Sequence, residues 1–283
     1  RVARKKKNFQ KAIELANENL ALSKLVNSSR MESWVYLDLY KIYYLDLHNY
    51  SVGLEYLERA VLLYEGKHEF TWRCSYARSL SYAAQYQQAK EQIKLASSNS
   101  SSKVDSLELY YTIGELYYEM EDYQIAAENY EMAISYFTED YNLLYKPILY
   151  YLGSSYYYLG EYESAINSYK KCFKYSKDQE DWIYEINSSL ALTYATMGKL
   201  DSSKQYYSIA NDLYNSVYDK KFWILYQINQ IYNNDELAMA YLDSSYNNLL
   251  ERSMRYTNKQ ERQTYLNNDK FNKHIIEEWE KVK

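Results

Sequence analysis

Small, aromatic and polar positions recur along this chain in one phrase, Gly-x-x-Tyr-x5-Tyr-x-x-Ala-x3-Tyr-x-x-Ala. Spacings of three and four residues place the named positions of each half on one face of a helix. The phrase therefore predicts two amphipathic helices joined by a short turn. Its two clearest copies are Gly114, Tyr117, Tyr123, Ala126, Tyr130 and Ala133, and then Gly153, Tyr156, Tyr162, Ala165, Tyr169 and Cys172.

Weaker copies of the phrase begin at Lys41, Ala77 and Ala191, so that successive copies start 36, 37, 39 and 38 residues apart. A single hairpin of this size cannot bury its apolar face, so neighbouring hairpins must stack on a common core. Small residues let two helices approach closely, and the aromatic residues fill the space beside that contact. The copies predict hairpins over about residues 32–65, 69–97, 105–139, 144–176 and 181–217.

The phrase resembles the tetratricopeptide repeat (TPR), over roughly residues 34 to 220. The resemblance implies an all-α fold, a right-handed α-solenoid of helix–turn–helix hairpins. Every interval exceeds the family's usual period of about 34 residues, which indicates slightly longer helices or loops. The prolines that often end a repeat are missing. We expect the single proline, Pro147, at the start of a helix, where its missing N–H is tolerated.

The repeat pattern predicts a TPR array over residues 1–250 and a separate segment over residues 251–283. Because Phe9, Ala12 and Ala16 match only the second helix of a hairpin, the first repeat is expected to be truncated and the parent protein to extend in the N-terminal direction. The last hairpin, over 221–232 and 236–250, is degenerate, as capping repeats usually are. The Ser-rich stretch 97–102 is predicted to be a mobile connection.

Residues 251–283 are charged and helix-prone, which indicates a helical capping or linker segment. The segment is similar to the linker that joins TPR arrays to a C-terminal CHAT peptidase domain, a caspase-like fold, in bacterial proteins. That resemblance implies that any catalytic His and Cys would lie beyond Lys283.

Tyrosine supplies 39 residues, and we expect most of them to pack between helices with their hydroxyls at the surface. The net charge of −5 argues against nucleic-acid binding, which requires a basic stripe facing phosphates. The basic cluster at Arg1, Arg4, Lys5, Lys6 and Lys7 is interpreted as a solvated helix end.

No catalytic motif, metal-ligand spacing or phosphate-binding glycine loop occurs, so the sequence predicts no enzyme activity, no metal and no cofactor within this segment. No apolar run is long enough for a membrane span. Cys74 and Cys172 lack disulfide or CxxC spacing, which favours a reducing, cytoplasmic compartment. Cys172 replaces a packing alanine and is predicted to be a small core residue.

The TPR resemblance implies that the first helix of each hairpin lines a concave groove that binds a partner. Helical spacing predicts a groove that is aromatic, and acidic near its middle. Such a surface suits a peptide or helix with basic and apolar anchors. The alternative is that these residues only solvate the face or pack against flanking segments of this chain. The predicted groove residues are Asp38, Arg78, Tyr82, Glu108, Tyr111, Glu115, Tyr118, Glu119, Tyr150, Ser154, Tyr157 and Tyr158.

Three functions remain open from the sequence. The leading hypothesis is a non-catalytic binding and regulatory array in a longer bacterial protein, which controls an attached effector such as a CHAT peptidase, or a signalling kinase or transcription-factor module. A free-standing TPR adaptor is the second. An enzyme built from the repeats themselves is the third, and no motif supports it.

Overall fold

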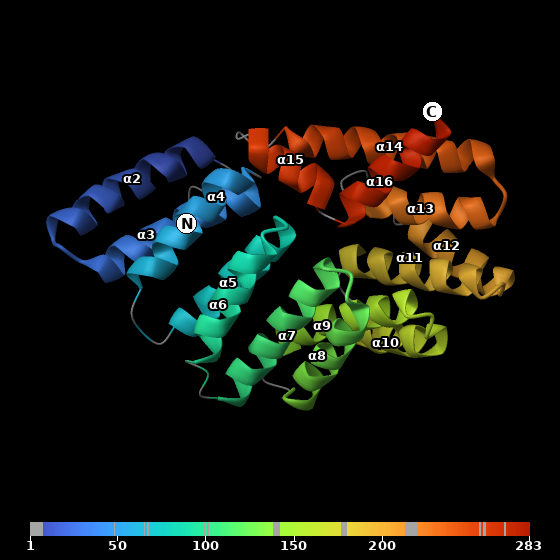
Figure 1. Ribbon diagram of the computed structural model, residues 1–283, viewed down its shortest axis with the longest axis horizontal. Coiled ribbons are helices and arrows are strands. Elements are labelled where there is room, and N and C mark those ends of the chain that lie inside the picture. Colours follow the sequence, from blue (N-terminus) through green and yellow to red (C-terminus); the bar gives the residue numbers. More distant parts are fainter. Residues whose placement is uncertain are drawn as a thin grey trace. The chain divides into compact units, whose positions relative to one another are not determined.

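The structure is a computed structural model, and it describes residues 8–47, 49–64, 66, 68–98, 100, 102–137, 142–176, 180–212, 220–254, 256, 259–268 and 270–283. Within these ranges the regular secondary structure is entirely helical (Figure 1). The predicted fold class, an all-α solenoid of helix–turn–helix hairpins, is confirmed. The basic cluster at residues 1–7 lies outside the described residues.

Six hairpins follow a first helix, α2 (Phe9–Leu25), and each predicted hairpin corresponds to a pair of helices in the structure. The last of the six hairpins is the degenerate one, and α15 (Lys259–Asn268) and α16 (Lys270–Val282) follow it. The pairs are α3 (Ser29–Tyr40), continued by the π-helix η1 (Lys41–Asp46), with α4 (Tyr50–Leu63); α5 (Glu69–Tyr82) with α6 (Tyr86–Ser97); α7 (Lys103–Glu119) with α8 (Tyr123–Ser135); α9 (Asn142–Tyr158) with α10 (Tyr162–Lys174); α11 (Glu180–Thr196) with α12 (Leu200–Asp212); and α13 (Lys220–Ile231) with α14 (Asp235–Ser253).

The glycines of the phrase let the two helices of a hairpin touch. A Cβ atom at Gly114 would lie 2.6 Å from the ring of Tyr130, and one at Gly153 would lie 2.7 Å from the ring of Tyr169. Both distances are shorter than carbon atoms tolerate. The phrase therefore pairs a small residue on the first helix with an aromatic ring on the second, as the sequence predicts.

Five of the turns between paired helices share one backbone feature, a residue with positive φ two positions after the first helix ends. Left-handed backbone is the usual way to end a helix, and glycine adopts it without steric cost. Asn49 caps the start of α4 and Asp122 caps the start of α8. Ser102 and Asp105 form a complete capping box at the start of α7, the first helix of its hairpin. The residues with positive φ are Ala84, Glu121, Gly160, Gly198 and Asn233.

The described chain forms two compact units. Unit 1 contains Arg1–Ser101 and Arg252–Leu266, and unit 2 contains Ser102–Glu251 and Asn267–Lys283. The division falls within the Ser-rich stretch 97–102, where the sequence predicts a connection. The segment 251–283, which the repeat pattern sets apart from the array, contributes to both units.

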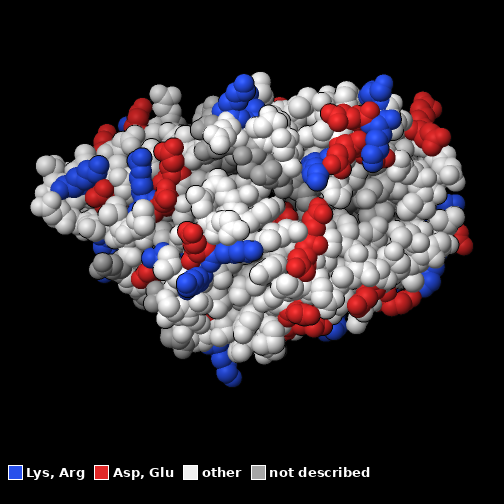
Figure 2. Space-filling view, viewed as in Figure 1, with Lys and Arg blue, Asp and Glu red and all other residues white. Residues whose placement is uncertain are grey.

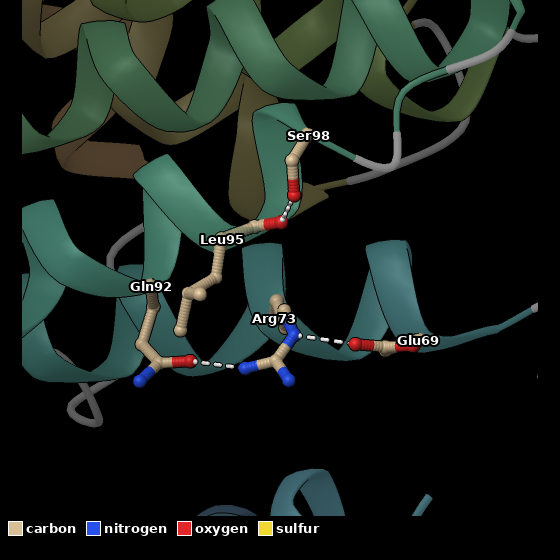
Figure 3. Close-up of polar contacts among 5 residues, drawn as sticks. All are labelled: Glu69, Arg73, Gln92, Leu95 and Ser98. Atoms are coloured by element: carbon tan, nitrogen blue, oxygen red, sulfur yellow. Dashed lines mark hydrogen bonds and ion pairs between the residues drawn. The ribbon is translucent and has the colours of Figure 1, made fainter. Parts of the chain in front are cut away.

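Aromatic rings join neighbouring hairpins of unit 1, and a partly buried arginine links the two helices of one hairpin. Trp34 on α3 meets Trp72 on α5 at a centroid distance of 4.8 Å, and Tyr64 lies 4.1 Å from Trp72. Arg73 on α5 is paired with Glu69 at 2.9 Å and donates a second hydrogen bond to Gln92 on α6 (Figure 3). The guanidinium thus links the two helices of this hairpin.

The core of unit 2 is built from the alanines and aromatic rings of the phrase. Ala126, Tyr130 and Ala133 of α8 are fully buried, and Ala165 and Cys172 of α10 occupy the corresponding places in the next hairpin. The prediction that Cys172 is a small core residue is confirmed. Its thiol donates to the backbone carbonyl of Lys146, and burial raises its pKa to about 12.

Pro147 lies inside α9 rather than at its start, because that helix begins at Asn142. The predicted position is therefore wrong by about one turn. A proline at this place leaves the carbonyl of Leu143 without its intrahelical donor. Leu143 is 81% exposed, so water can reach this end of the helix and compensate for the missing bond.

Candidate functional site

A cavity of about 270 Å³ lies within unit 2, and most of its wall comes from the first helices of successive hairpins. Helices α7, α9, α11 and α13 each supply side chains, with α10 and α16 completing the lining. Nine of the fifteen described lining residues are aromatic. The lining residues are Tyr118, Tyr150, Tyr151, Ser154, Tyr157, Tyr158, Tyr169, Trp182, Glu185, Ser189, Leu192, Trp223, Ile224, Gln227 and Phe271.

Five of the predicted groove residues meet at this cavity: Tyr118, Tyr150, Ser154, Tyr157 and Tyr158. Four of them belong to α9, where spacings of three and four residues place them on one side of the helix. Tyr118 comes from α7, one hairpin earlier.

The other predicted groove residues of unit 2 lie elsewhere on α7. Glu108 is half-buried, whereas Tyr111, Glu115 and Glu119 are buried among the helices. The ring of Tyr111 lies 6.2 Å from that of Tyr130 in the core. These side chains therefore contribute to packing within unit 2 and do not line the cavity.

Three predicted groove residues belong to unit 1. Asp38 lies on α3, and Arg78 and Tyr82 lie on α5. All three are half-buried. Arg78 donates to the hydroxyl of Ser75, which lies on the same helix.

The structure adds lining residues that the sequence did not single out, chiefly Trp182, Glu185, Trp223 and Phe271. Ser189 lies 39 residues after Tyr150, and Glu185 and Trp182 precede Ser189 by four and seven residues. This spacing places them on the same helix face and is the signal that could have identified them. Phe271 carries no such signal because it lies beyond the repeats, on α16.

Hydrogen bonds between tyrosine and a small hydroxyl residue 39 positions later connect first helices of neighbouring hairpins. Tyr150 pairs with Ser189 at 3.3 Å, and Tyr157 pairs with Thr196 at 3.2 Å. The same spacing joins Tyr40 to Ser79 within unit 1, at 3.1 Å. The Tyr40 and Tyr150 pairs are partly buried, so the expectation that tyrosine hydroxyls lie at the surface is wrong there, whereas the Tyr157–Thr196 pair is exposed.

The cavity combines neutral phenols with a single carboxylate. The Tyr150 hydroxyl donates to Glu185 at 3.3 Å, and the Tyr169 hydroxyl donates to Ser154 at 3.1 Å. Burial, reinforced by the negative charge of Glu185, raises the pKa of Tyr150 well above its usual value. Burial likewise raises the pKa values of Tyr118 and Tyr158. These phenols stay protonated over the physiological range, so the formal charge of the lining belongs to Glu185 alone.

Helix α16 packs on unit 2 and brings Phe271 to the cavity. The Phe271 ring lies 6.5 Å from that of Tyr118, and Trp279 stacks on Tyr246 of α14 at 4.0 Å with nearly parallel rings. The Trp279 indole N–H donates to Asp243 at 2.7 Å. A segment outside the repeats therefore supplies one aromatic residue of the described lining.

Polar contacts at both ends reinforce this packing of α16. Near its start, His274 lies 3.1 Å from Glu121, which sits in the turn between α7 and α8. Near its end, Glu278 accepts from the Tyr226 hydroxyl of α13 at 2.8 Å.

On the face drawn in Figure 2, charged side chains of both signs are scattered between wide uncharged areas, and no basic stripe is seen. Among the described residues, no cluster of His, Cys, Asp and Glu could hold a metal ion. No helix in the described part of the chain is long and apolar enough to cross a membrane.

Comparison with known proteins identifies the repeat. The family model described as tetratricopeptide repeat matches residues 105–178, which include α7 to α10. A search of curated proteins found no match.

Solved structures of low sequence identity share the fold. The Cut9–Hcn1 hetero-tetramer of APC/C has a TM-score of 0.63 at 15% identity, over 92% of this chain and 46% of that chain. A Rap protein complexed with competence and sporulation factor has a TM-score of 0.60 at 12% identity, over 95% and 81%. PilF of Pseudomonas aeruginosa has a TM-score of 0.50 at 16% identity, over 82% and 96%. Residues 105–178 thus match the tetratricopeptide repeat, and the described part of the chain has the all-α, hairpin-built fold that these solved structures share.

Proposed function

We propose that this chain is a non-catalytic scaffold that binds a peptide or helix of a partner protein at the aromatic cavity of unit 2. One observation carries the proposal: rings from four successive first helices converge on a space that side chains of this unit leave open. Pockets that hold a ligand group are typically lined by aromatic residues with a few placed polar groups. Large, rigid rings also dominate the energetics of protein interfaces.

The predicted preference for a partner with basic and apolar anchors agrees with this lining. Glu185 is the one formal charge among the described lining residues, and the rest of the wall is mainly aromatic. A cation held by ring faces and a carboxylate gains from both. Two structural neighbours were also solved as complexes. One is the Cut9–Hcn1 hetero-tetramer, and the other is a Rap protein complexed with competence and sporulation factor.

We further propose that partner binding controls an effector that is attached to or associated with this chain in a bacterial cytoplasm. The similarity of the 251–283 segment to the TPR-to-CHAT linker makes a CHAT peptidase the first candidate for that effector. Unit 2 supports a coupling of this kind, because α16 at the C-terminal end of the segment supplies Phe271 to the cavity. A free-standing adaptor, or the sensory region of a signalling or transcription regulator, is the alternative.

The test uses proteins captured from the native host by the intact chain and by two variants. Tyr157→Ala together with Trp182→Ala removes two rings from the cavity. Phe173→Ala is the matched control, because Phe173 is an exposed aromatic residue of α10 outside the lining. We expect a partner whose dissociation constant, measured with purified components, rises at least tenfold with the double variant and is unchanged by the control. Equal binding by all three chains, or the absence of any partner, would contradict the proposal.

A further inference from the structure

The cavity of unit 2 has the composition of an aromatic cage. Nine rings surround it, and none of its fifteen described lining residues is Lys, Arg or His. The negative faces of aromatic rings attract cations, and tryptophan provides the strongest attraction. Both Trp182 and Trp223 are among the nine rings. The lining therefore favours a positively charged group over a neutral one or an anion.

Three pairs of the rings meet at steep angles, as the walls of a cage do. Tyr150 and Trp182 lie 5.7 Å apart at 76°, and Tyr150 and Tyr151 lie 5.5 Å apart at 77°. Tyr157 and Tyr158 form a third corner, 5.3 Å apart at 75°. A rounded group placed in such a corner contacts more than one ring. A planar stack of parallel rings would suit a flat group instead.

Several polar groups of the lining already make hydrogen bonds. Glu185 accepts from Tyr150, and Ser154 accepts from Tyr169 while its own hydroxyl donates to the backbone carbonyl of Tyr150. A primary ammonium would need several acceptors to replace its water, and leaving its N–H groups unpaired in a buried site is costly. An alkylated ammonium donates few or no hydrogen bonds, so this lining suits it better.

The volume is consistent with a group of this size. The cavity holds about 270 Å³. Pockets for drug-sized ligands begin at about 300 Å³, so this cavity is suited to a headgroup or the end of a side chain. Glu185 supplies the compensating negative charge within the same wall.

We propose that this cavity is a binding site for an alkylated ammonium cation. The cation contacts the faces of Trp182, Trp223 and the surrounding tyrosines, and Glu185 balances its charge. This inference deepens the proposed function and partly rests on it, because a methylated lysine of a partner protein is one source of such a group. A small free quaternary ammonium compound is the other source.

The first experiment compares choline with 3,3-dimethylbutan-1-ol, its uncharged isostere, by calorimetric titration of the full chain. The two probes have the same shape, so their difference reports the charge. A cation–π contribution of about 1–2 kcal/mol corresponds to choline binding roughly 5- to 30-fold more tightly. Equal binding of the two probes, or no binding of choline, would overturn the inference.

Variants then assign the contacts. Trp182→Leu and Glu185→Gln are each expected to weaken choline binding at least fivefold, because one loses a ring face and the other loses the charge. Phe173→Leu is the control, since this exposed ring lies outside the lining, and it should leave choline binding unchanged. Circular dichroism and thermal unfolding establish that each variant is folded. Choline binding that is the same in Trp182→Leu and Glu185→Gln as in the unaltered chain would place the cation elsewhere and overturn the assignment.

The two sources are separated by competition. Peptides with a trimethylated lysine and matched unmodified peptides are titrated with and without choline. Preference for the methylated peptide, lost on addition of choline, identifies a protein side chain as the source. Choline binding without any methylated peptide binding supports the inference with a small-molecule source and counts against the proposed peptide site. A natural partner that binds the cavity and is not displaced by choline would support the proposed function and overturn the ammonium inference.

Discussion

Units 1 and 2 both bring together aromatic rings from neighbouring hairpins, but the rings pack against one another in unit 1 and line a cavity in unit 2. In unit 1, the rings of Trp34, Tyr64 and Trp72 lie against one another, and Tyr64 and Trp72 are only 3% and 6% exposed. We call these three residues the tryptophan cluster. In unit 2, the rings that include Tyr150 and Trp182 surround a cavity of about 270 Å³. Tyrosine and tryptophan therefore form part of the packed core in unit 1 and line a cavity in unit 2.

This contrast shows why aromatic content alone does not locate a binding site. Rings that fill one another's space contribute mainly to stability, since each buries a large apolar area. Rings that line an open volume keep part of that area available to a ligand. Substitutions in the two regions should therefore separate stability from binding.

The largest effect is expected for Trp72→Ala in the tryptophan cluster. Removal of a fully packed tryptophan side chain typically lowers the free energy of unfolding by about 3–5 kcal/mol. Trp182→Ala should cost clearly less, because Trp182 is only partly buried and faces the cavity. Urea unfolding followed by circular dichroism measures both. Equal losses in the two variants would show that the rings of the cavity are packed as tightly as those of the cluster.

A medium effect is expected for Gly153→Ala. The new methyl group would lie 2.7 Å from the ring of Tyr169, which lines the cavity, so the ring must move. Overpacking of this kind costs about 1–3 kcal/mol, which the better helix propensity of alanine offsets by about 1 kcal/mol. Ligand binding at the cavity should weaken together with stability.

Gly114→Ala is the matched control for Gly153→Ala. The same contact occurs there with Tyr130, at 2.6 Å, and Tyr130 does not line the cavity. Both variants should therefore lose a similar free energy of unfolding, whereas only Gly153→Ala should weaken binding. Chemical denaturation measures the free energy of unfolding of each variant, and titration with the ligand measures its binding affinity. Weakened binding in both variants would mean that overall stability, and not the position of the Tyr169 ring, controls the cavity.

The positions of the hairpins could be predicted from the sequence because close helix contact requires a small residue at a fixed spacing from an aromatic ring. Gly114 with Tyr130 and Gly153 with Tyr169 meet this requirement directly. The start of α9 was harder to predict. Proline is common in the first turn of a helix, which suggested a start near Pro147, but the helix begins earlier, at Asn142.

Only part of the cavity could be predicted in the same way. Tyr150, Ser154 and Tyr157 share one face of α9, and helical periodicity identifies such a face. Periodicity does not tell which acidic residue of the chain reaches a cavity. Glu115 fits the predicted face of α7 and is buried, whereas Glu185 of α11 lies at the cavity. Phe271 depends on how a segment beyond the repeats packs, which no repeat pattern encodes.

A pH effect is expected at α16, where Trp279 packs as closely on Tyr246 as the rings of the tryptophan cluster do on one another. The Trp279 N–H, with help from Lys283, lowers the pKa of Asp243 below its usual 3.8. The hydrogen bond from Tyr226, with help from Lys281, lowers the pKa of Glu278 below its usual 4.5. Released carboxylates bind protons more readily than docked ones. The docking of α16 is therefore fully stabilised above about pH 4.5 and weakens as the pH falls through the lowered values.

The indole N–H resonance of Trp279 reports this transition in a nuclear magnetic resonance titration. We expect it to move toward the position of a free indole below pH 3.8, the usual pKa of an aspartate. Asp243→Asn keeps an acceptor for the indole and removes the charge, so it should reduce the pH dependence of the resonance. A resonance that does not change between neutral and acid pH would contradict the contribution of these carboxylates.

The smallest effect is expected for Lys199→Ala in unit 2. Lys199 lies 2.9 Å from Glu163, but the two side chains are 49% and 73% exposed, and such pairs contribute about 0–1 kcal/mol. The Arg73–Glu69 pair of unit 1 has the same length with side chains only 15% and 26% exposed, and Arg73 also binds Gln92. Arg73→Ala should therefore lower the free energy of unfolding more than Lys199→Ala does, and added salt should diminish that difference little. Equal, salt-sensitive losses would show that Arg73 acts as a surface charge and that its bond to Gln92 adds little to the joining of α5 and α6.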